Sequence, residues 1–572
     1  MGDIYSASSG TLPAIPDDLT IPQFQLDHCT GPKRSSKTPC LIEDASGRQV
    51  FLEEVRERTQ GLTNALSSLY SIGEEDVVLL FSRNHLDYPI ALWAVHRVGG
   101  IVSPANPDFS RKELEFQLKA TKATLLIIHP DALDVSVAAA RETGLPMDRI
   151  LVFDVPNAKA SNFITVDGLI KRGLRMKAFS DRRLRPGEGR TKLALLSFSS
   201  GTTGTPKAVA IPHIAVIANV LQLAAHSKVN EECGEWKDRR YRPGDVAIGV
   251  LPFYHIYGLV VNLHFLLYCA MTIVVVPKFN FEGMLRSIVR HKITHLMIVP
   301  PQAVLLCKHP AVKKYDLSGI RYIMIGAAPL SDEVNEKLFR LFPDAHIGQG
   351  YGMTETCTVT SIWPIERKRG ISGSAGQLVP GVIARVVKTD GTLGGYNEVG
   401  ELVVKAPSNA LGYYNNPQAT EETFIDGFVR TGDEVRITPE GELWIIDRIK
   451  EIMKVRGFQV APAELEGTLL DHPDVSDACV VGVPDEYSGE VPLAFVVLSE
   501  DAARKVTQSP GALQDITTSI LKHVADNKIA YKHLAGGVEF VDSIPKNPSG
   551  KLLRRMLRER AKELRKVVKA KL

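Results

Sequence analysis

At 572 residues this chain is too long for a single hydrophobic core, and about three or four domains or subdomains are expected. Apolar residues make up 44% of it and charged residues 23%, which excludes a disordered or fibrous chain, and a net charge of +3 gives no global field for binding nucleic acid. Its seven cysteines include no Cys-x-x-Cys pair, which argues against structural zinc and against a disulfide framework.

Neither a signal peptide nor a transmembrane segment is expected. Residues 1–5 lack the basic-then-apolar pattern of a signal peptide. One apolar run, residues 259–277, approaches the length of a membrane span, but it contains Asn262 and His264 and ends at a proline. We therefore expect a buried helix followed by a buried strand in this run.

The region from 50 to 300 alternates helical patterns with short apolar runs, and the series continues a little further. Such alternation indicates parallel sheets built from β-α-β units. The strands expected from these runs are 77–81, 123–128, 193–196, 246–251, 294–299 and 322–325.

The most informative segment is 197–209, which directly follows the strand expected at 193–196. It contains six hydroxyl side chains, two glycines and one cation, Lys207. Backbone N–H groups, hydroxyl donors and an ammonium can together wrap a phosphate chain. It is not a Walker loop, because Pro206 stands five residues after Gly201 where that loop has Gly-Lys-Ser/Thr. The alternative is a flexible, solvated connection.

A second segment, Gly348 to Thr356, combines glycines with polar side chains. Its three glycines allow a planar ring to lie against the backbone, and Tyr351 can stack on that ring. Thr354 offers a hydroxyl to a phosphate, and Glu355 is a hard oxygen ligand suited to Mg²⁺ that phosphates and water also hold. A glycine-rich turn with a surface glutamate is the alternative.

Two shorter segments add candidate contacts for a nucleotide. Residues 326–330 follow the strand 322–325, and their small side chains leave room for a ligand at its carboxyl end. Residues 431–433 read as a tight turn whose carboxylate, Asp433, accepts both hydroxyls of a ribose, and Arg448 could add a donor to the same sugar. Each segment alone also fits a plain turn.

Two isolated side chains have more ambiguous surroundings. Lys551 ends a loop that begins at Pro545 and contains two prolines, so an ammonium aimed at a phosphate or carboxylate is plausible. His255 lies among aromatic residues in 251–258, where a lone histidine is more often a core residue than a ligand.

After about residue 375 the pattern changes to short strands and turns, which predicts a small β-barrel or a curled antiparallel sheet. A compact α+β segment follows Arg448, with a helix start at Pro462 and strands at 478–483 and 493–498. An amphipathic helix is expected at 552–568. Its apolar side is expected to carry Leu553, Met556, Leu557 and Leu564.

The last three residues, Ala570, Lys571 and Leu572, resemble the Ser-Lys-Leu peroxisomal address. This pattern predicts recognition by the peroxisomal import receptor and location in the peroxisome. If the signal is not read, the cytoplasm is the expected location.

Taken together, these motifs resemble the adenylate-forming acyl-CoA synthetase superfamily, and most nearly its 4-coumarate:CoA ligase and firefly luciferase branch. The resemblance implies an α/β multidomain fold. Its large N-terminal domain, 1–448, would hold two α/β subdomains and a β-barrel at about 375–448. A hinge at 449–450 with Lys450 at the hinge position would lead into a small, mobile α+β domain, 451–572.

The resemblance implies a two-step reaction. ATP and a carboxylic acid give an acyl-adenylate and pyrophosphate, and coenzyme A then gives a thioester and AMP. ATP, Mg²⁺, coenzyme A and a small carboxylic acid are therefore the expected ligands. Because Val261 and Met324 stand at pocket positions that are more polar in several coumarate ligases, we expect a largely apolar acid. Cinnamate-like, phenylacetate-like and medium-chain fatty acids fit this description.

The resemblance also assigns roles to the nucleotide-binding residues. Those expected at the β- and γ-phosphates are Ser199, Ser200, Gly201, Thr202, Thr203, Gly204 and Lys207, with Thr354 on phosphate and Glu355 on Mg²⁺. Those expected around the adenine are Gly326, Ala327, Ala328, Gln349, Gly350, Tyr351 and Gly352, with Asp433 and Arg448 on the ribose. The acid is expected to contact His255, Tyr257, Val261, Met324 and Gly350.

In the family, the small domain alternates between two postures. Lys551 matches the lysine that bridges the acid carboxylate and phosphate oxygens during adenylation, a contact worth about 3–4 kcal/mol. Rotation of the small domain is then expected to withdraw Lys551 and to present a second face to coenzyme A. That face comprises Lys454, Arg456, Gly457, Phe458 and Gln459, and Lys454 and Gln459 also match positions near AMP or the reacting centre. His255 is a further candidate catalytic residue.

Two departures from the family pattern stand out: Ala208 occupies a position that is often glycine, and Thr356-Cys357 replaces a common Ala-Gly pair. Three other functions remain open. The chain could be a luciferase-like oxygenase, or it could load a carrier protein, although no carrier domain is visible after Lys551. It could also be an inert nucleotide-binding scaffold, but the chain retains the full set of Lys207, Glu355, Asp433 and Lys551, which argues against this alternative.

Overall fold

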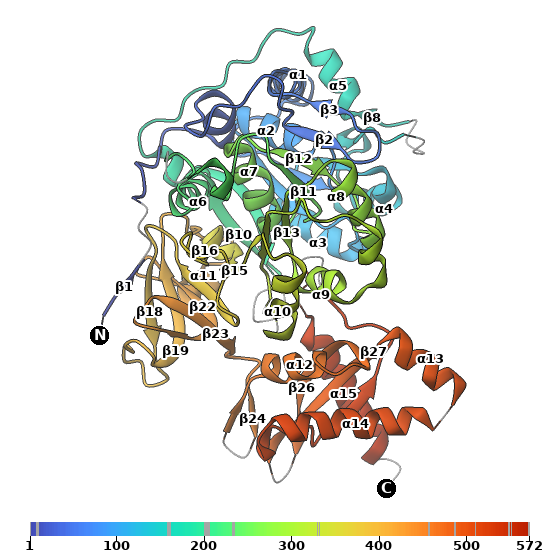
Figure 1. Ribbon diagram of the computed structural model, residues 1–572. Helices are drawn as coiled ribbons and strands as arrows, with labels where there is room; N and C mark the ends of the chain where they lie inside the picture. Colours follow the sequence, from blue (N-terminus) through green and yellow to red (C-terminus); the bar gives the residue numbers. More distant parts are fainter. Residues whose placement is uncertain are drawn as a thin grey trace.

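The computed structural model describes residues 2–6, 11–156, 162–199, 206–231, 235–328, 330, 332–455, 458–485, 488–509, 511–546, 550 and 552–569. The described strands form three sheets. Figure 1 shows a large body that contains two of these sheets and a small C-terminal body, coloured orange to red, that contains the third.

The first sheet has eight strands, and those from β9 to β8 are parallel. Its order is β20 (Gly412–Tyr413), β10 (Lys207–Pro212), β9 (Leu193–Ser199), β5 (Ile101–Ala105), β4 (Val77–Phe81), β6 (Leu125–Ile128), β7 (Ile150–Val152) and β8 (Ile164–Thr165). The strands predicted at 77–81, 123–128 and 193–196 are confirmed, and the last continues to Ser199.

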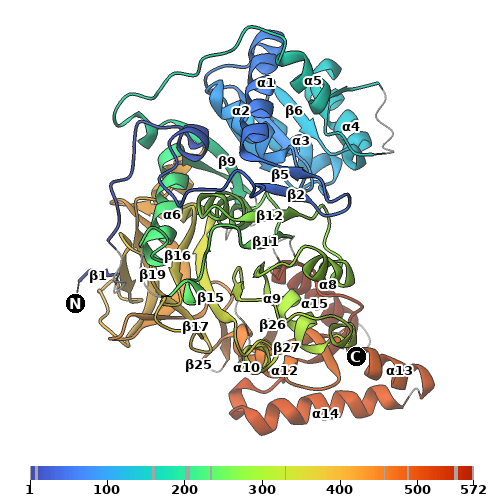
Figure 2. The same cartoon turned by 45° about the horizontal axis from the view of Figure 1, so that its top comes forward.

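Helices cover both faces of this sheet, as β-α-β connections require. Helices α1 (Leu52–Tyr70), α2 (Tyr88–Arg97) and α5 (Val166–Gly173) pack together in one core. Helices α3 (Arg111–Thr121) and α4 (Leu133–Thr143) pack in a separate core on the other side. Figure 2 shows α1 and α2, in blue, lying beside each other.

The second sheet has 15 strands, which are mainly parallel in one half and antiparallel in the other. Its parallel half consists of β2 (Leu41–Glu43), β12 (Thr272–Val275), β11 (Val246–Gly249), β13 (His295–Ile298), β14 (Tyr322–Ile325) and β15 (His346–Met353), with β3 (Gln49–Val50) antiparallel at the edge. Helices α8 (Phe281–Arg290), α9 (Pro300–Lys308) and α10 (Asp332–Leu341) pack on one face of it.

The strand β15 joins the two halves of this sheet. Its first residues pair with β14 in parallel, and its last residues pair with β16 in antiparallel. The antiparallel half consists of β16 (Thr358–Ile362), β17 (Ser374–Leu378), β23 (Glu442–Arg448), β22 (Phe428–Ile437), β19 (Val399–Lys405), β18 (Ile383–Val387) and β1 (Ile4–Tyr5), with β21 (Phe424–Ile425) beside β22. A curled antiparallel sheet was expected in this part of the chain.

The apolar run at 259–277 folds as predicted, into buried helix and strand. It contains the π-helix η6 (Tyr257–Phe265), the short helix α7 (Leu266–Tyr268) and β12. Its polar members form hydrogen bonds inside the core: Asn262 donates to the carbonyl of Ile248 (3.1 Å), and His264 accepts from the Trp93 indole (3.1 Å). Among the described residues, the amide oxygen of Asn262 has no partner. Among the described residues, no helix has the length and apolar character needed to cross a membrane.

The third sheet forms the small body. Its strands are β24 (Met453–Val455), β25 (Phe458–Val460), β26 (Val475–Asp485), β27 (Gly489–Leu498) and β28 (Gly537–Phe540). Its helices are α12 (Pro462–Leu470), α13 (Glu500–Gln508), α14 (Ala512–Asn527) and α15 (Arg554–Lys569). The predicted helix start at Pro462 and both predicted strands are confirmed, and Figures 1 and 2 show α14 at the end of this body remote from the first sheet.

The C-terminal helix differs from its prediction in two respects: it begins at Arg554, so that Leu553 precedes it, and Met556 is not on its apolar side. Leu557, Ala561 and Leu564 follow each other at helical spacing and pack against the third sheet. Met556 was expected on the same side, but it is 57% exposed, because this register turns it to the solvent.

Candidate active site

The predicted phosphate segment lies between two paired strands. β9 ends at Ser199 and β10 begins at Lys207, and these two residues face each other across the antiparallel pair. Ser200 to Thr205, which include five of the predicted phosphate contacts, lie outside the described residues. The strand pairing therefore places Ser199 and Lys207 side by side.

Glu355 lies in the short 3₁₀-helix η8 (Thr354–Thr356) that follows β15. It is only 4% exposed, which rules out the alternative of a surface glutamate. Its Oε1 atom accepts hydrogen bonds from Ser199 Oγ (2.8 Å) and from the hydroxyl of Tyr413 (2.9 Å). The fold thus joins the two predicted phosphate-binding segments through one carboxylate.

The chemistry of this carboxylate fits a magnesium ligand. Both hydrogen bonds reach Oε1, and within the described part of the chain no hydrogen bond reaches Oε2. Mg²⁺ prefers hard oxygen ligands and is usually held by one or two carboxylates together with phosphates and water. The described residues contain no group of three or more His, Cys, Asp or Glu side chains arranged to hold a metal ion.

Asp433 and Arg448 face each other on β22 and β23, and the structure joins them directly. Arg448 Nε lies 3.0 Å from Asp433 Oδ1, and the Tyr351 hydroxyl donates to Asp433 Oδ2 (2.6 Å). Burial, followed by the charge of Asp433, raises the pKa of Tyr351 well above its ordinary value. All three predicted nucleotide contacts therefore form one cluster.

The turn predicted at 431–433 is wrong, because these residues lie inside the long strand β22. Opposite them, the pairing with β19 jumps from Glu401–Glu434 to Val403–Arg430, which is a β-bulge. Gly432 has φ = +70°, a value that glycine adopts without strain. The bulge contains Thr431, Gly432 and Asp433, and it changes the direction in which the Asp433 side chain leaves the strand.

Packing inside the protein constrains two of the glycines in 348–352. A Cβ on Gly348 would lie 2.2 Å from the Trp363 ring, and one on Gly352 would lie 1.5 Å from the carbonyl oxygen of Thr358. Packing within the protein therefore excludes side chains at these two positions, whether or not a ring lies nearby.

The segment after β14 is held by side chains from its neighbours. Ala327 has φ = +73°, a strained conformation for a residue with a side chain. The Gln349 amide oxygen accepts from the backbone N–H of Leu330 (3.2 Å), so β15 fixes the loop that carries Gly326 to Ala328. These predicted adenine contacts thus lie together at the carboxyl ends of β14 and β15.

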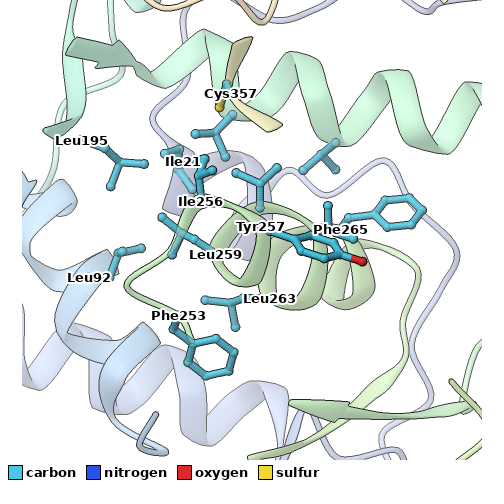
Figure 3. Packing of buried hydrophobic residues seen from close by; sticks show 14 of the residues in the cluster. Ile21, Leu92, Leu195, Phe253, Ile256, Tyr257, Leu259, Leu263, Phe265 and Cys357 are labelled. Carbon is cyan, nitrogen blue, oxygen red and sulfur yellow. The ribbon is translucent and has the colours of Figure 1, made fainter. Parts of the chain in front are cut away.

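The predicted acid-binding residues also lie together, in apolar surroundings. Tyr257 and Val261 come from η6, and the Tyr257 hydroxyl donates to the backbone carbonyl of Met324 (3.3 Å). The Met324 methyl would lie 2.7 Å from a Cβ on Gly350, so it covers that glycine. Figure 3 shows Tyr257 on the same helix as Leu259, Leu263 and Phe265.

His255 precedes η6 and is half-buried. Its Nδ1 accepts from the backbone N–H of Tyr257 (3.3 Å), which fixes the ring relative to the helix. A neutral histidine that accepts at Nδ1 carries its proton on Nε2, so this nitrogen is the donor that His255 can offer.

The small body meets the large one near the predicted position of Lys551. Lys551 itself lies outside the described residues, but its neighbour Gly550 does not. A Cβ on Gly550 would lie 3.1 Å from a methyl of Val299 and 3.5 Å from Pro301, at the junction of β13 and α9. This loop of the small body therefore lies against the large body.

Two described residues of the predicted second face, Lys454 and Phe458, contact residues of their own body. Lys454 is exposed, and its backbone N–H donates to Glu490 (2.8 Å). Phe458 is 54% exposed and stacks on Tyr531 of the same body at 4.5 Å. Arg456, Gly457 and the side chain of Gln459 lie outside the described residues.

The chain crosses between the bodies at 449–452, a turn between β23 and β24 that includes Lys450. Two contacts hold the bodies on either side of it. The Asp447 carboxylate accepts from the backbone N–H of Ala463 (3.0 Å), and Lys308 donates to the carbonyl of Leu470 (2.9 Å).

One residue of the site was not predicted. Tyr413 contacts Glu355 through its hydroxyl, and its ring centroid lies 4.9 Å from the Lys207 ammonium. It stands in a two-residue strand with no glycine-rich or charged pattern of its own, so nothing in its local sequence pointed to it.

Two family models match the chain. The model for AMP-binding enzymes matches residues 31–414, and the model for the AMP-binding enzyme C-terminal domain matches 464–551. 4-Coumarate--CoA ligase 2 of Oryza sativa subsp. japonica is 34% identical over 542 residues, which cover 91% of this chain and 89% of that protein. An acyl-CoA ligase of Alternaria alternata is 33% identical over 572 residues, with coverages of 95% and 94%.

Solved structures agree with this assignment. ATP-bound MatB from Rhodopseudomonas palustris has a TM-score of 0.79 at 25% identity and covers 96% of this chain and 100% of its own. The anthranilate CoA ligase AuaEII in complex with anthranoyl-AMP has a TM-score of 0.81 at 23% identity, with coverages of 96% and 98%, which shows the fold. The predicted fold class is confirmed, and the chain belongs to the AMP-binding enzyme family, in its acyl-CoA ligase branch.

Proposed function

We propose that this protein is an ATP- and Mg²⁺-dependent acid–CoA ligase that acts on a small, largely apolar acid, aromatic or medium-chain. One observation carries the proposal. Ser199, Lys207 and Glu355 meet at one place, and Tyr351 of the Tyr351–Asp433–Arg448 cluster stands only four residues before Glu355 in the chain. Groups suited to phosphates and groups suited to a ribose therefore lie at the two ends of one short segment.

ATP would lie along this segment. Asp433 would accept hydrogen bonds from the ribose hydroxyls, while Arg448 holds the carboxylate in place. Lys207 and the hydroxyls beside it bind the phosphates. Glu355 would hold Mg²⁺, which supplies charge neutralisation on the phosphate oxygens.

The first chemical step forms the acyl-adenylate. A carboxylate oxygen of the acid attacks the α-phosphorus, and the bond to the bridging oxygen of pyrophosphate breaks, so that pyrophosphate leaves with that electron pair. Two anions must approach each other, and we propose that Lys551, whose neighbour Gly550 lies against Val299, relieves their repulsion.

The second step forms the thioester. The coenzyme A thiolate attacks the acyl carbon, and the bond to the AMP oxygen breaks, so that AMP leaves. In the described posture Lys454 and Phe458 contact Glu490 and Tyr531 of their own body, and we propose that the small body rotates before the second step.

The acid pocket supports an apolar substrate. Val261 is fully buried, Met324 is 1% exposed, and the Tyr257 hydroxyl is already bound to a backbone carbonyl. A pocket with few free hydrogen-bonding groups favours apolar acids but rejects an added hydroxyl only weakly, by about a hundredfold. The coumarate ligases among the relatives make cinnamate-like acids the first to test.

A panel of acids with purified protein, ATP, Mg²⁺ and coenzyme A tests the proposal. Cinnamate, phenylacetate or medium-chain acids should yield AMP, pyrophosphate and the acyl-CoA. Turnover of strongly hydroxylated cinnamates alone would contradict the apolar pocket. Light from luciferin without thioester formation would favour the luciferase-like alternative, and no turnover with any acid would favour an inert protein.

The tail Ala570-Lys571-Leu572, which lies outside the described residues, supports a peroxisomal location. A fluorescent protein fused before the intact tail should enter peroxisomes. The same fusion without the last three residues should remain in the cytoplasm, and equal distributions of the two fusions would contradict the proposal.

A further inference from the structure

Tyr413 is held firmly by its own surroundings. Its strand β20 pairs with β10, and the flanking backbone N–H groups of Leu411 and Tyr414 donate to carbonyls of that strand at 2.9 and 2.7 Å. The ring is packed edge-on against Phe424 at 5.6 Å, and the residue is only 8% exposed. A side chain fixed in this way can orient its neighbours.

The hydroxyl of Tyr413 acts on one oxygen of Glu355. It donates to Oε1, the same atom that Ser199 Oγ binds. The Glu355 backbone is also anchored nearby, because its carbonyl accepts from the N–H of Ala410 (2.9 Å). Among the described residues no hydrogen bond reaches Oε2, so we expect this oxygen to be the one that binds a metal ion.

The ring of Tyr413 acts on Lys207. The ammonium lies 4.9 Å from the ring centroid, within the range of a cation–π contact. The aromatic face attracts the cation and limits where the long lysine side chain can go. One tyrosine therefore touches both the candidate metal ligand and the candidate phosphate cation, which come from different segments of the chain.

We infer that Tyr413 is a positioning residue of the nucleotide site, orienting Glu355 toward Mg²⁺ with its hydroxyl and Lys207 toward the phosphates with its ring. The inference rests on the proposed function, since it requires that MgATP binds here. The two parts of the side chain make different contributions to the binding of ATP. The hydroxyl contributes only when Mg²⁺ is present, whereas the ring contributes to phosphate binding with or without the metal.

Three variants separate these contributions. Tyr413→Phe keeps the ring and removes the hydroxyl, and Tyr413→Leu removes both. Tyr414→Phe, one position along the same segment, is the matched control for loss of a tyrosine hydroxyl. Binding of ATP to each protein is measured by calorimetry, without acid or coenzyme A, once with Mg²⁺ and once with a chelator.

Tyr413→Phe should weaken MgATP binding about tenfold, because a hydrogen bond to a charged group is lost, and leave metal-free ATP within about twofold of wild type. Tyr413→Leu should also weaken metal-free ATP, by about fivefold, because Lys207 loses its aromatic contact. Tyr414→Phe should match wild type in both titrations.

Two results would overturn the inference. Equal affinities of Tyr413→Phe and wild type for MgATP would show that the hydroxyl orients nothing. An equal loss with and without Mg²⁺ would show a merely structural role. If Tyr413→Leu does not fold, the Tyr413→Phe comparison still decides the matter. Failure of wild type to bind MgATP at all would instead refute the proposed function.

Discussion

At the scale of single residues, two glycines of β15 differ in how strictly their surroundings exclude a side chain. Gly352 faces a backbone carbonyl that cannot move, whereas Gly350 faces only the flexible end of Met324. These two positions lie two residues apart on the same strand, yet a methyl group at each would have different consequences.

We predict that Gly352→Ala destabilises the protein by about 3 kcal/mol or more, because the added carbon overlaps backbone atoms. Gly350→Ala should cost less than about 1.5 kcal/mol, since the Met324 methyl can swing away into the acid pocket. Urea denaturation measures both.

Gly350→Ala should also narrow the range of acids used, with the largest losses for the bulkiest acids. If the acid spectrum of this variant matches that of wild type, Met324 and Gly350 do not line the acid pocket.

At the scale of elements, the C-terminal helix is anchored by a buried arginine as well as by its apolar face. Arg554 contacts Glu451 in the crossover turn and forms two bonds to Glu466 in α12, at 2.6 and 3.1 Å. Burial opposes the charge, but Glu466 and Glu451 outweigh it and raise the pKa of Arg554 above its ordinary value. The first turn of α15 thereby joins the linker to α12.

Replacing Arg554 with Met should destabilise the small body by about 3–5 kcal/mol, because two buried carboxylates lose their shared cation. Arg560→Met, at an exposed position of the same helix, should stay within about 0.5 kcal/mol of wild type. The free energies of unfolding of both variants are measured by denaturant titration. Similar unfolding midpoints for the two variants would mean that the apolar face alone holds α15 in place.

Much of this organisation follows from local sequence. Continuous runs such as Val77 to Phe81 became strands at the predicted residues, because β-branched and apolar runs of that length suit only a buried strand. Ser199, Lys207 and Glu355 were also correctly grouped, since their motifs carry chemistry that is rare in loops without a ligand.

What local sequence missed depends on pairing between distant strands. The bulge at Gly432 is defined by its partner β19, and without that partner Thr431–Asp433 looks like a turn. Tyr413 gains its role from pairing with β10, and Met556 is exposed because Leu557 and Ala561 decide the register of α15. Such features require the tertiary fold.

At the scale of the whole molecule, the contact between the two bodies contains a buried carboxyl group. Asp447, at the end of β23, is 6% exposed and accepts from the small body's Ala463. Burial raises its pKa to about 6, with Glu466 adding to the rise, although Arg554 and the backbone bonds from Ala463 and Arg448 oppose it. Three of these influences, from Ala463, Glu466 and Arg554, come from α12 and α15 of the small body.

This pKa predicts how the posture of the two bodies depends on pH. If the bodies separate, water reaches Asp447 and its pKa returns toward 3.8, so the packed posture binds a proton more tightly. The ratio of packed to separated molecules should therefore rise about tenfold for each unit that the pH falls between about 6 and 3.8, and change little above about pH 7.

Spin labels on the two bodies, with distances measured by electron resonance at several pH values, would follow this equilibrium. Asp447→Asn resembles the protonated group and should remove the pH dependence. A dependence that persists in this variant would assign the effect to another group.

The account as a whole depends on one claim, that the protein forms an acyl-adenylate on ATP before coenzyme A reacts. Exchange of labelled pyrophosphate into ATP, with an acid and Mg²⁺ but no coenzyme A, tests it most directly. The account predicts exchange that requires the acid and falls by about a hundredfold or more in Lys551→Ala. Exchange that is absent without coenzyme A for every acid, or unchanged in Lys551→Ala, would contradict it.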